Sequence, residues 1–161
     1  MSAKPRDESE SVWDYPRPPR LEPVTEPVRV TFEGAEVART DSAVRILETA
    51  SPPTVYLPMA DVRMDLLSPS SGGSTFCEWK GAAEYFDVAS EGVVSARAAW
   101  YYPQPSEAFR AIADHVSFYP ALVECFIGEE RVRPQAGGFY GGWVTDRIRG
   151  PFKGEPGTEG W

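Results

Sequence analysis

Short runs in which apolar and polar residues alternate, each ended by glycine or proline, constrain the fold of this chain more than any other feature. The clearest run covers residues 28–33, and Gly34 follows it at the position of a hairpin turn. Alternation with a period of two is typical of a strand that buries one face. The 16 prolines and 14 glycines suit strands joined by turns and argue against a helical bundle. The sequence therefore predicts a mainly β protein of short antiparallel strands.

The same pattern predicts the other elements. We expect hairpin turns at Glu91-Gly92 and at residues 128–130, and one helical turn within residues 61–67. One short helix is expected after Ser106 as N-cap, because apolar residues then recur at helical spacing as far as Val116. The remaining expected strands cover residues 36–41, 43–49, 54–57, 75–80, 82–86, 93–102, 123–127 and 131–133.

The 161 residues match one domain that is large enough to bury a core. Residues 1–11 are polar and charged, and we expect them to be a disordered tail that precedes a single β-rich domain at 12–161. Prolines hold residues 13–23 extended, either as a strap along the domain or as a flexible linker. The glycine-rich segment 134–161 is expected to wrap the domain through its aromatic residues, which are Phe139, Tyr140, Trp143, Phe152 and Trp161.

The formal charge of −8 argues against nucleic-acid binding, because the basic residues are scattered and form no patch. The first ten residues lack the apolar run of a secretory leader, and no segment is apolar over the length of a bilayer. We therefore expect a cytoplasmic protein without a membrane partner. In that compartment Cys77 and Cys125 are expected to be free thiols.

Aromatic, thiol and charged residues are densest in residues 74–86, next to the strand 93–102. On that second strand one face runs from Val94 to Tyr102 without a polar interruption, so it must be core or pocket wall. Aromatic walls with a few polar groups are the composition of a small-ligand pocket. The alternative is an ordinary aromatic core. Lys80 favours the pocket, because lysine is seldom buried without a purpose.

Glu48 is a second charged candidate. If the strand 43–49 turns Val44 and Ile46 inward, Glu48 also points into an apolar interior, where its pKa would rise unless a cation such as Arg63 pairs with it. If the strand is turned over, Glu48 is solvated.

Other chemical groups give weaker signals. Cys77 could act as a nucleophile only beside a base or a positive charge. Strict alternation puts Lys80 on the opposite face unless the bend expected at Lys80-Gly81 comes early, so inert packing is the simpler interpretation. His115 is the sole histidine, and with two cysteines it cannot complete a closed zinc site, so we expect no metal and no cofactor. The glycine-rich run 137–142 lacks the lysine and Ser/Thr of a phosphate-binding loop.

Several motifs occur in one order along the chain, at residues 13–18, 44–49, 61–64, 75–81, 100–103 and 118–120. In this respect the chain resembles the bacterial and fungal family known as domain of unknown function 427. The resemblance implies a β-tent (Mss4-like) barrel. Members of that family are sometimes labelled nucleotidyltransferases, but this chain lacks their Gly-Ser element followed by an Asp-x-Asp pair. Relatives with the same general barrel often carry Cys-x-x-Cys pairs that bind zinc, and these are also missing here.

Our leading hypothesis is that the domain binds a small organic ligand in an aromatic cleft. The alternatives are a nucleotidyltransferase-like enzyme and a protein interaction module that uses the proline-rich segment and the aromatic tail. The expected ligand-binding residues are Trp79, Lys80, Tyr85, Trp100, Tyr102, Glu48 and Arg63.

Overall fold

The computed structural model describes residues 9–16, 19–77, 79–136 and 141–153. Strands take up 49% of these residues and helical turns 11%, which confirms the mainly β class. The tent-type barrel implied by the resemblance stays a prediction.

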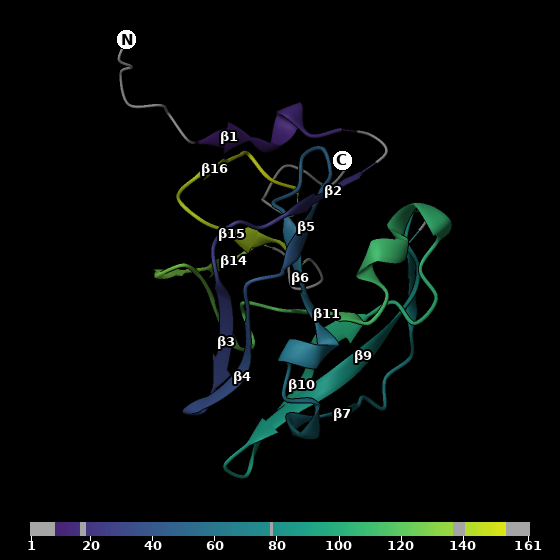
Figure 1. Cartoon of the computed structure of the whole chain (residues 1–161), viewed down its shortest axis with the longest axis vertical. Coiled ribbons are helices and arrows are strands. Elements are labelled where there is room, and N and C mark those ends of the chain that lie inside the picture. The colour runs from purple at the N-terminus through teal and green to yellow at the C-terminus, as the bar shows by residue number, and fades with distance from the viewer. Residues whose placement is uncertain (1–8, 17–18, 78, 137–140, 154–161) are drawn as a thin grey trace.

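The largest sheet has eight strands, and its paired neighbours are all antiparallel. Its longest hairpin joins β9 to β10 and crosses the lower half of Figure 1. Glu91 and Gly92 form the turn of this hairpin and both have positive φ, as a tight two-residue hairpin requires, so the predicted turn is confirmed. In spatial order the strands are β2 (Arg20–Pro23), β5 (Val44–Leu47), β6 (Thr54–Pro58), β11 (His115–Phe118), β10 (Val93–Tyr101), β9 (Gly81–Ser90) and β7 (Leu67–Pro69), with β8 (Thr75–Cys77) also paired to β9.

A second sheet contains the alternating run of residues 28–33. Its order is β13 (Glu130–Arg131), β12 (Glu124–Ile127), β3 (Val28–Phe32) and β4 (Ala35–Thr40). Glu33 and Gly34 turn the chain between β3 and β4 with positive φ at both residues, which confirms the predicted hairpin.

Two small sheets of two strands each complete the fold, and the first of them joins the N-terminal part of the chain to the C-terminal part. β1 (Glu10–Ser11) pairs with β16 (Ile148–Arg149), and β14 (Arg133–Pro134) pairs with β15 (Trp143–Val144). The last two residues of the expected tail thus form a strand, while residues 1–8 lie outside the described part. Part of the proline-rich segment lies against the domain, because β2 pairs with β5 and the 3-10 helix η1 (Val12–Asp14) buries Val12. Three of the expected aromatic anchors, Phe139, Tyr140 and Trp161, lie outside the described residues.

The large sheet is buried on both faces. Strand β6 shows the pattern: Val55 and Leu57 join a core cluster shared with the second sheet, while Tyr56 points to the opposite face. On that opposite face a second cluster gathers most of the aromatic residues singled out in the sequence. Its members are Ile46, Tyr56, Ala83, Tyr85, Trp100, Tyr102, Phe109 and Ile112.

A bulge in β10 overturns one prediction. Pairing with β9 shifts register between Ser95 and Ala99, and Arg97 within this gap has a φ of 52°. The face predicted to run unbroken from Val94 to Tyr102 is therefore wrong. Val94 is 61% exposed, Ala98 belongs to the first cluster, and only Trp100 and Tyr102, which follow the bulge, belong to the second cluster.

The predicted helix is shorter than expected. The 3-10 helix η4 (Glu107–Ile112) buries Phe109 and Ile112, but the chain then turns at Asp114, whose φ is 60°, and continues as β11. Val116 consequently lies in a strand. Ser106 is the N-cap residue, as predicted, but its side chain caps no N–H group of η4 and donates instead to the Trp79 carbonyl.

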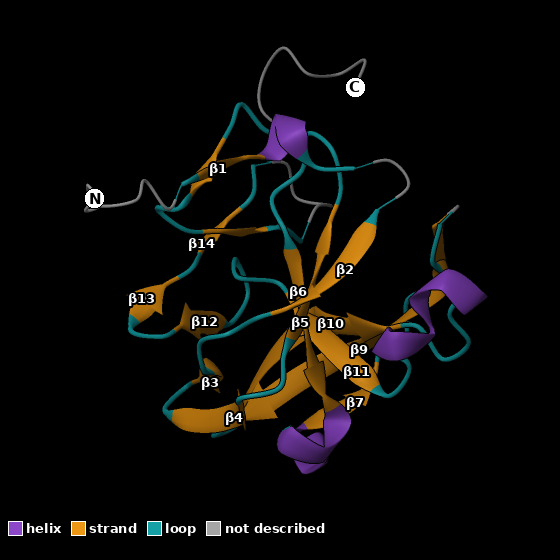
Figure 2. Ribbon diagram, turned by 45° about the horizontal axis from the view of Figure 1, so that its top comes forward, coloured by secondary structure: helices purple, strands orange, loops and turns teal. Residues whose placement is uncertain are grey.

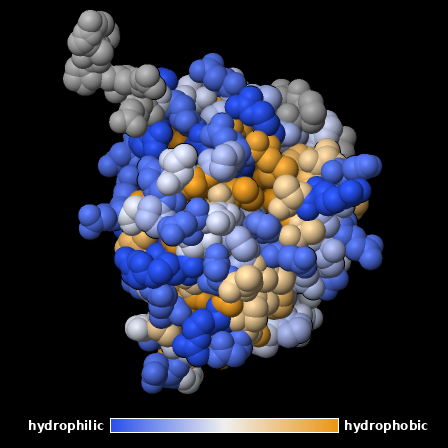
Figure 3. Space-filling model, in the orientation of Figure 1, coloured by the Kyte–Doolittle hydropathy of each residue, from blue (hydrophilic) through white to orange (hydrophobic). Residues whose placement is uncertain are grey.

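The remaining helical segments are single turns, η2 (Met59–Asp61) and η3 (Met64–Leu66). The turn predicted within residues 61–67 is confirmed as η3, whereas η2 was not predicted. Figure 2 shows the helical turns at the periphery of the strands. Within the described ranges, no helix has the length and apolar character needed to cross a membrane. On the face drawn in Figure 3, apolar side chains lie in recesses between hydrophilic ones.

Candidate functional site

The second cluster opens into a cavity of about 250 Å³, which we call the aromatic cleft. Its walls come mainly from β5, β6, β8, β9 and β10. The structure thus brings together five of the seven predicted ligand-binding residues: Glu48, Lys80, Tyr85, Trp100 and Tyr102. The full lining is Ile46, Glu48, Ser51, Pro52, Thr54, Tyr56, Thr75, Phe76, Cys77, Lys80, Tyr85, Trp100, Tyr102, Tyr119, Gln135, Gly141 and Lys153.

Hydrogen bonds and ring contacts fix the aromatic wall of the cleft. Trp100 Nε1 donates to the Tyr56 hydroxyl at 3.2 Å, with the two rings nearly perpendicular and their centroids 6.2 Å apart. The Tyr119 ring lies 4.6 Å from the Trp100 ring, and the Tyr85 hydroxyl shares a 2.8 Å hydrogen bond with Thr75 Oγ1. Aromatic pairs at such distances prefer defined relative orientations, so the wall is preorganised.

A tight turn aims Lys80 into the cleft. Cys77 pairs with Gly81, so the chain reverses between β8 and β9 instead of continuing as the single strand predicted for residues 75–80. Ser106 anchors this turn, because its N–H donates to the Lys80 carbonyl at 2.9 Å and its hydroxyl donates to the Trp79 carbonyl at 2.6 Å. Lys80 is only 8% exposed, whereas Trp79 is 40% exposed and does not line the cleft.

Lys80 is a buried cation with a distant partner. Its Nζ lies 4.0 Å from Glu48 Oε1, and the exposed fractions of the two side chains are 10% and 38%. Burial by itself lowers the pKa of Lys80, but the potential of Tyr56, Cys77 and Glu48 raises it by more, so the net shift is upward. Lys80 therefore carries its positive charge at neutral pH.

The predicted pairing of Glu48 with Arg63 is wrong. Arg63 lies between η2 and η3, where it pairs with Asp65 at 2.7 Å, and both side chains are more than half exposed. Arg63 does not line the aromatic cleft. A sequence cannot show which cation will face a given strand, because that depends on the tertiary placement of the loops.

The tyrosines of the cleft are hydrogen-bond donors at neutral pH. Burial is the main cause that raises the pKa of Tyr56, Tyr102 and Tyr119 above the ordinary value of a phenol. Each hydroxyl therefore keeps its proton. The rings of Tyr56 and Tyr102 are also neighbours, with their centroids 6.4 Å apart.

Cys77 and Lys80 both line the cleft, because the turn brings together two residues that strict alternation would separate. Cys125 is fully buried in the first cluster, and burial raises the pKa of its thiol well above the ordinary value. The ring of His115 bonds the Ala113 carbonyl at 2.9 Å, which suits a structural role. The described residues hold no group of three or more His, Cys, Asp and Glu side chains placed to bind a metal, and the expected lack of a metal stays a prediction.

The cleft also contains residues that the sequence analysis missed. Tyr56 lies in a strand whose middle residues are all buried, so alternation could not say which face it takes. Gly141 comes from the C-terminal segment and touches Trp100 so closely that a Cβ there would sit 2.2 Å from the ring. This close approach of a glycine has no signal in the sequence, although the glycine-rich composition around it permits it.

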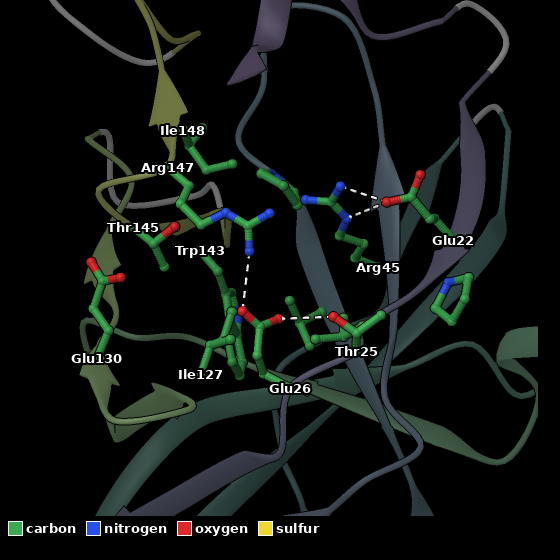
Figure 4. Close-up of a pocket in the computed structure, with 14 residues that line it drawn as sticks. Glu22, Thr25, Glu26, Arg45, Ile127, Glu130, Trp143, Thr145, Arg147 and Ile148 are labelled. Atoms are coloured by element: carbon green, nitrogen blue, oxygen red, sulfur yellow. Dashed lines mark hydrogen bonds and ion pairs between the residues drawn. The ribbon is translucent and has the colours of Figure 1, made fainter. Parts of the chain in front are cut away.

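A second cavity, of about 220 Å³, lies where β2 and β5 meet the C-terminal segment (Figure 4). Its charged groups bind one another. Arg45 contacts Glu22 at 2.5 Å and Glu10 at 2.9 Å, and Arg147 contacts Glu26 at 3.1 Å. Charged side chains that are already paired at hydrogen-bond distance have fewer donors and acceptors left for a ligand. We therefore take the aromatic cleft as the candidate site.

The comparison with known proteins agrees with the motifs in the sequence. No curated protein sequence matches the chain. A family model matches residues 20–129, about two thirds of the chain, and confirms the resemblance drawn from the motifs. The chain therefore belongs to the family described as a domain of unknown function (DUF427).

Proposed function

We propose that the protein binds a small organic ligand in the aromatic cleft. The observation that carries this proposal is Lys80, a cation in an aromatic wall whose nearest described carboxylate stands 4.0 Å away. Removing an ammonium group from water is costly unless close partners replace the lost hydration. A ligand in the cleft would supply such a partner.

The location of the cleft supports the same proposal. Glu48, Lys80 and most other lining residues fall within residues 20–129, the part of the chain that the family model matches. The second cavity depends more on residues beyond that part, including Trp143, Thr145 and Arg147. A function shared by the family is therefore better placed in the aromatic cleft.

A thermal-shift screen tests the proposal. Small aromatic and polar metabolites are tried beside nucleotides with and without magnesium, because the family label also suggests nucleotidyl transfer. A ligand at one hundred times its Kd stabilises the fold by about 2.7 kcal/mol, which raises the Tm by several degrees in a domain of this size.

Two exposed side chains provide the matched variants for this screen. Phe76 lines the cleft and is 78% exposed, whereas Val94 is 61% exposed and does not line it. We expect Phe76→Ala to reduce the stabilisation by a ligand and Val94→Ala to leave it unchanged. Stabilisation by nucleotide plus magnesium alone, or equal effects of the two variants, would overturn the proposal.

A further inference from the structure

The charges that line the aromatic cleft differ in sign from those of the protein as a whole. Lys80 and Lys153 are cations and Glu48 is an anion, so the described lining has a formal charge of +1. The whole chain has a formal charge of −8. A small positive site in an acidic protein attracts an anion and disfavours a cation.

The donors in the cleft also favour an anion. Lys80 Nζ has three N–H groups, and an ammonium group can donate but cannot accept. The Tyr102 ring also lines the cleft, with its centre 6.0 Å from Lys80 Nζ. A ligand atom that accepts hydrogen bonds and carries negative charge would complement the ammonium group.

The size of the cleft and its charge limit the kind of anion. A volume of about 250 Å³ lies just below the range of about 300–1,000 Å³ for typical ligand pockets, so one or two rings fit better than a nucleotide. Lys80 is the one buried cation in the described lining, and one ammonium group matches one negative charge. Phosphate monoesters carry close to two negative charges at neutral pH and favour arginine forks, and the described lining contains no arginine.

The shape of the walls indicates a flat ligand. Trp100, Tyr102 and Tyr119 present aromatic rings to the cleft, and Gly141 keeps the C-terminal segment close to the Trp100 ring. Flat aromatic surfaces pair favourably with another ring by stacked or edge contacts.

We propose that the ligand is an aryl or heteroaryl carboxylate, whose carboxylate binds Lys80 Nζ and whose ring contacts Trp100. This inference rests on the proposed function of the cleft and adds the chemical class of the ligand.

Four probes with one ring system test the class: 2-naphthoate, 2-naphthamide, 2-naphthylmethylamine and 2-naphthyl phosphate. Their affinities are measured by calorimetry and ligand-observed NMR on the full chain. We expect the carboxylate to bind at least about tenfold more tightly than the amide, because a hydrogen bond to a charged group is worth that much or more.

Lys80→Met should remove this preference, lowering the affinity for naphthoate at least about tenfold while leaving the affinity for the amide unchanged. Arg63→Met is the matched control, since it removes one cation from an exposed site outside the cleft. Naphthoate binding to that variant should stay within about twofold of wild type, as expected for a distant screened charge. Lys80→Gln serves as a second variant if Lys80→Met fails to fold.

The outcomes separate the two proposals. Equal binding of acid and amide, or tighter binding of the amine or the phosphate, overturns the carboxylate class but leaves a ligand-binding cleft. If none of the probes binds while the thermal-shift screen finds another cleft ligand, the class is again overturned and the proposed function stands. If the screen finds no cleft ligand either, both proposals fail.

Discussion

Lys80→Met and Glu48→Gln both break the ion pair between these residues, but we expect them to change the free energy of unfolding by different amounts. At 4.0 Å, two unit charges attract by about 4 kcal/mol at an effective dielectric constant near 20. Glu48 is 38% exposed, so screening by water reduces this to roughly 1 kcal/mol. Both Lys80→Met and Glu48→Gln remove the same attraction, but each leaves a different group behind.

Glu48→Gln leaves an ammonium group that is only 10% exposed without its carboxylate, and we expect a loss of about 1–2 kcal/mol in the free energy of unfolding. Lys80→Met leaves a carboxylate that water still reaches, and it places an apolar side chain in an aromatic wall. That variant should stay within about 1 kcal/mol of wild type. In the double variant the loss caused by Glu48→Gln should disappear, because no buried cation remains.

Urea unfolding at neutral pH, followed by tryptophan fluorescence, measures all four proteins. The midpoints should differ while the m-values stay equal, as expected when the folded state keeps its compactness. A Lys80→Met variant that loses about 3 kcal/mol or more would show that Lys80 is a structural residue. A Glu48→Gln variant as stable as wild type would show that the cation is already satisfied by other groups. Either result would refute the reasoning that leads from Lys80 to a ligand.

Three further variants test the geometry of the fold. Burial raises the pKa of Tyr102, so the unfolded chain loses its phenol proton at a lower pH than the folded chain does. The free energy of unfolding should therefore fall as the pH rises above about 10. In urea unfolding, Tyr102→Phe should reduce the slope of this fall by up to about 1.4 kcal/mol per pH unit. Gly141→Ala should lower the free energy of unfolding by about 1–3 kcal/mol in thermal melts, because the added Cβ displaces Trp100. Gly73→Ala is the control: its Cβ would meet nothing within 4 Å, and its free energy of unfolding should stay within about 1 kcal/mol of wild type. Trp143→Ala should lower the free energy of unfolding by about 3–5 kcal/mol, because the side chain is buried and its indole N–H donates to a main-chain carbonyl. A loss under about 1 kcal/mol would contradict the place of Trp143 in the core.

Alternation and turn chemistry in the sequence were sufficient to predict the β class and the three tight hairpins at Gly34, Glu91-Gly92 and residues 128–130. They failed where long-range packing overrides a local pattern. Phe109 and Ile112 have helical spacing and are buried as predicted, yet the chain reverses at Asp114 because β11 completes the sheet between β6 and β10. The bulge around Arg97 has no signal of its own, since a left-handed arginine is an unusual choice for such a position.

The candidate site could be predicted only in part, because long-range packing also decides which side chains reach the cleft. Lys80 and Tyr85 follow from the density of aromatic and charged residues near the turn, and the structure places both in the cleft. Trp79 was expected beside them, but the turn directs its ring outward. Tyr119 was missed because it follows a strand that the sequence analysis had assigned to a helix. Chemical type could thus be inferred from composition. The direction of each side chain depended on where the chain turns, and the bend expected at Lys80-Gly81 is in the structure a reversal between Cys77 and Gly81.

The most direct test is to find where a ligand binds, and two tryptophans report on the two cavities. Trp100 lines the aromatic cleft, and Trp143 lines the second cavity. The protein is labelled with ¹⁵N at tryptophan, and the indole N–H signals are followed while the strongest ligand from the thermal-shift screen is added. We predict a saturable shift of the Trp100 signal with the Trp143 signal unchanged. A shift of Trp143 without Trp100, or no shift of either signal at ligand concentrations that raise the Tm, would contradict a binding site in the aromatic cleft.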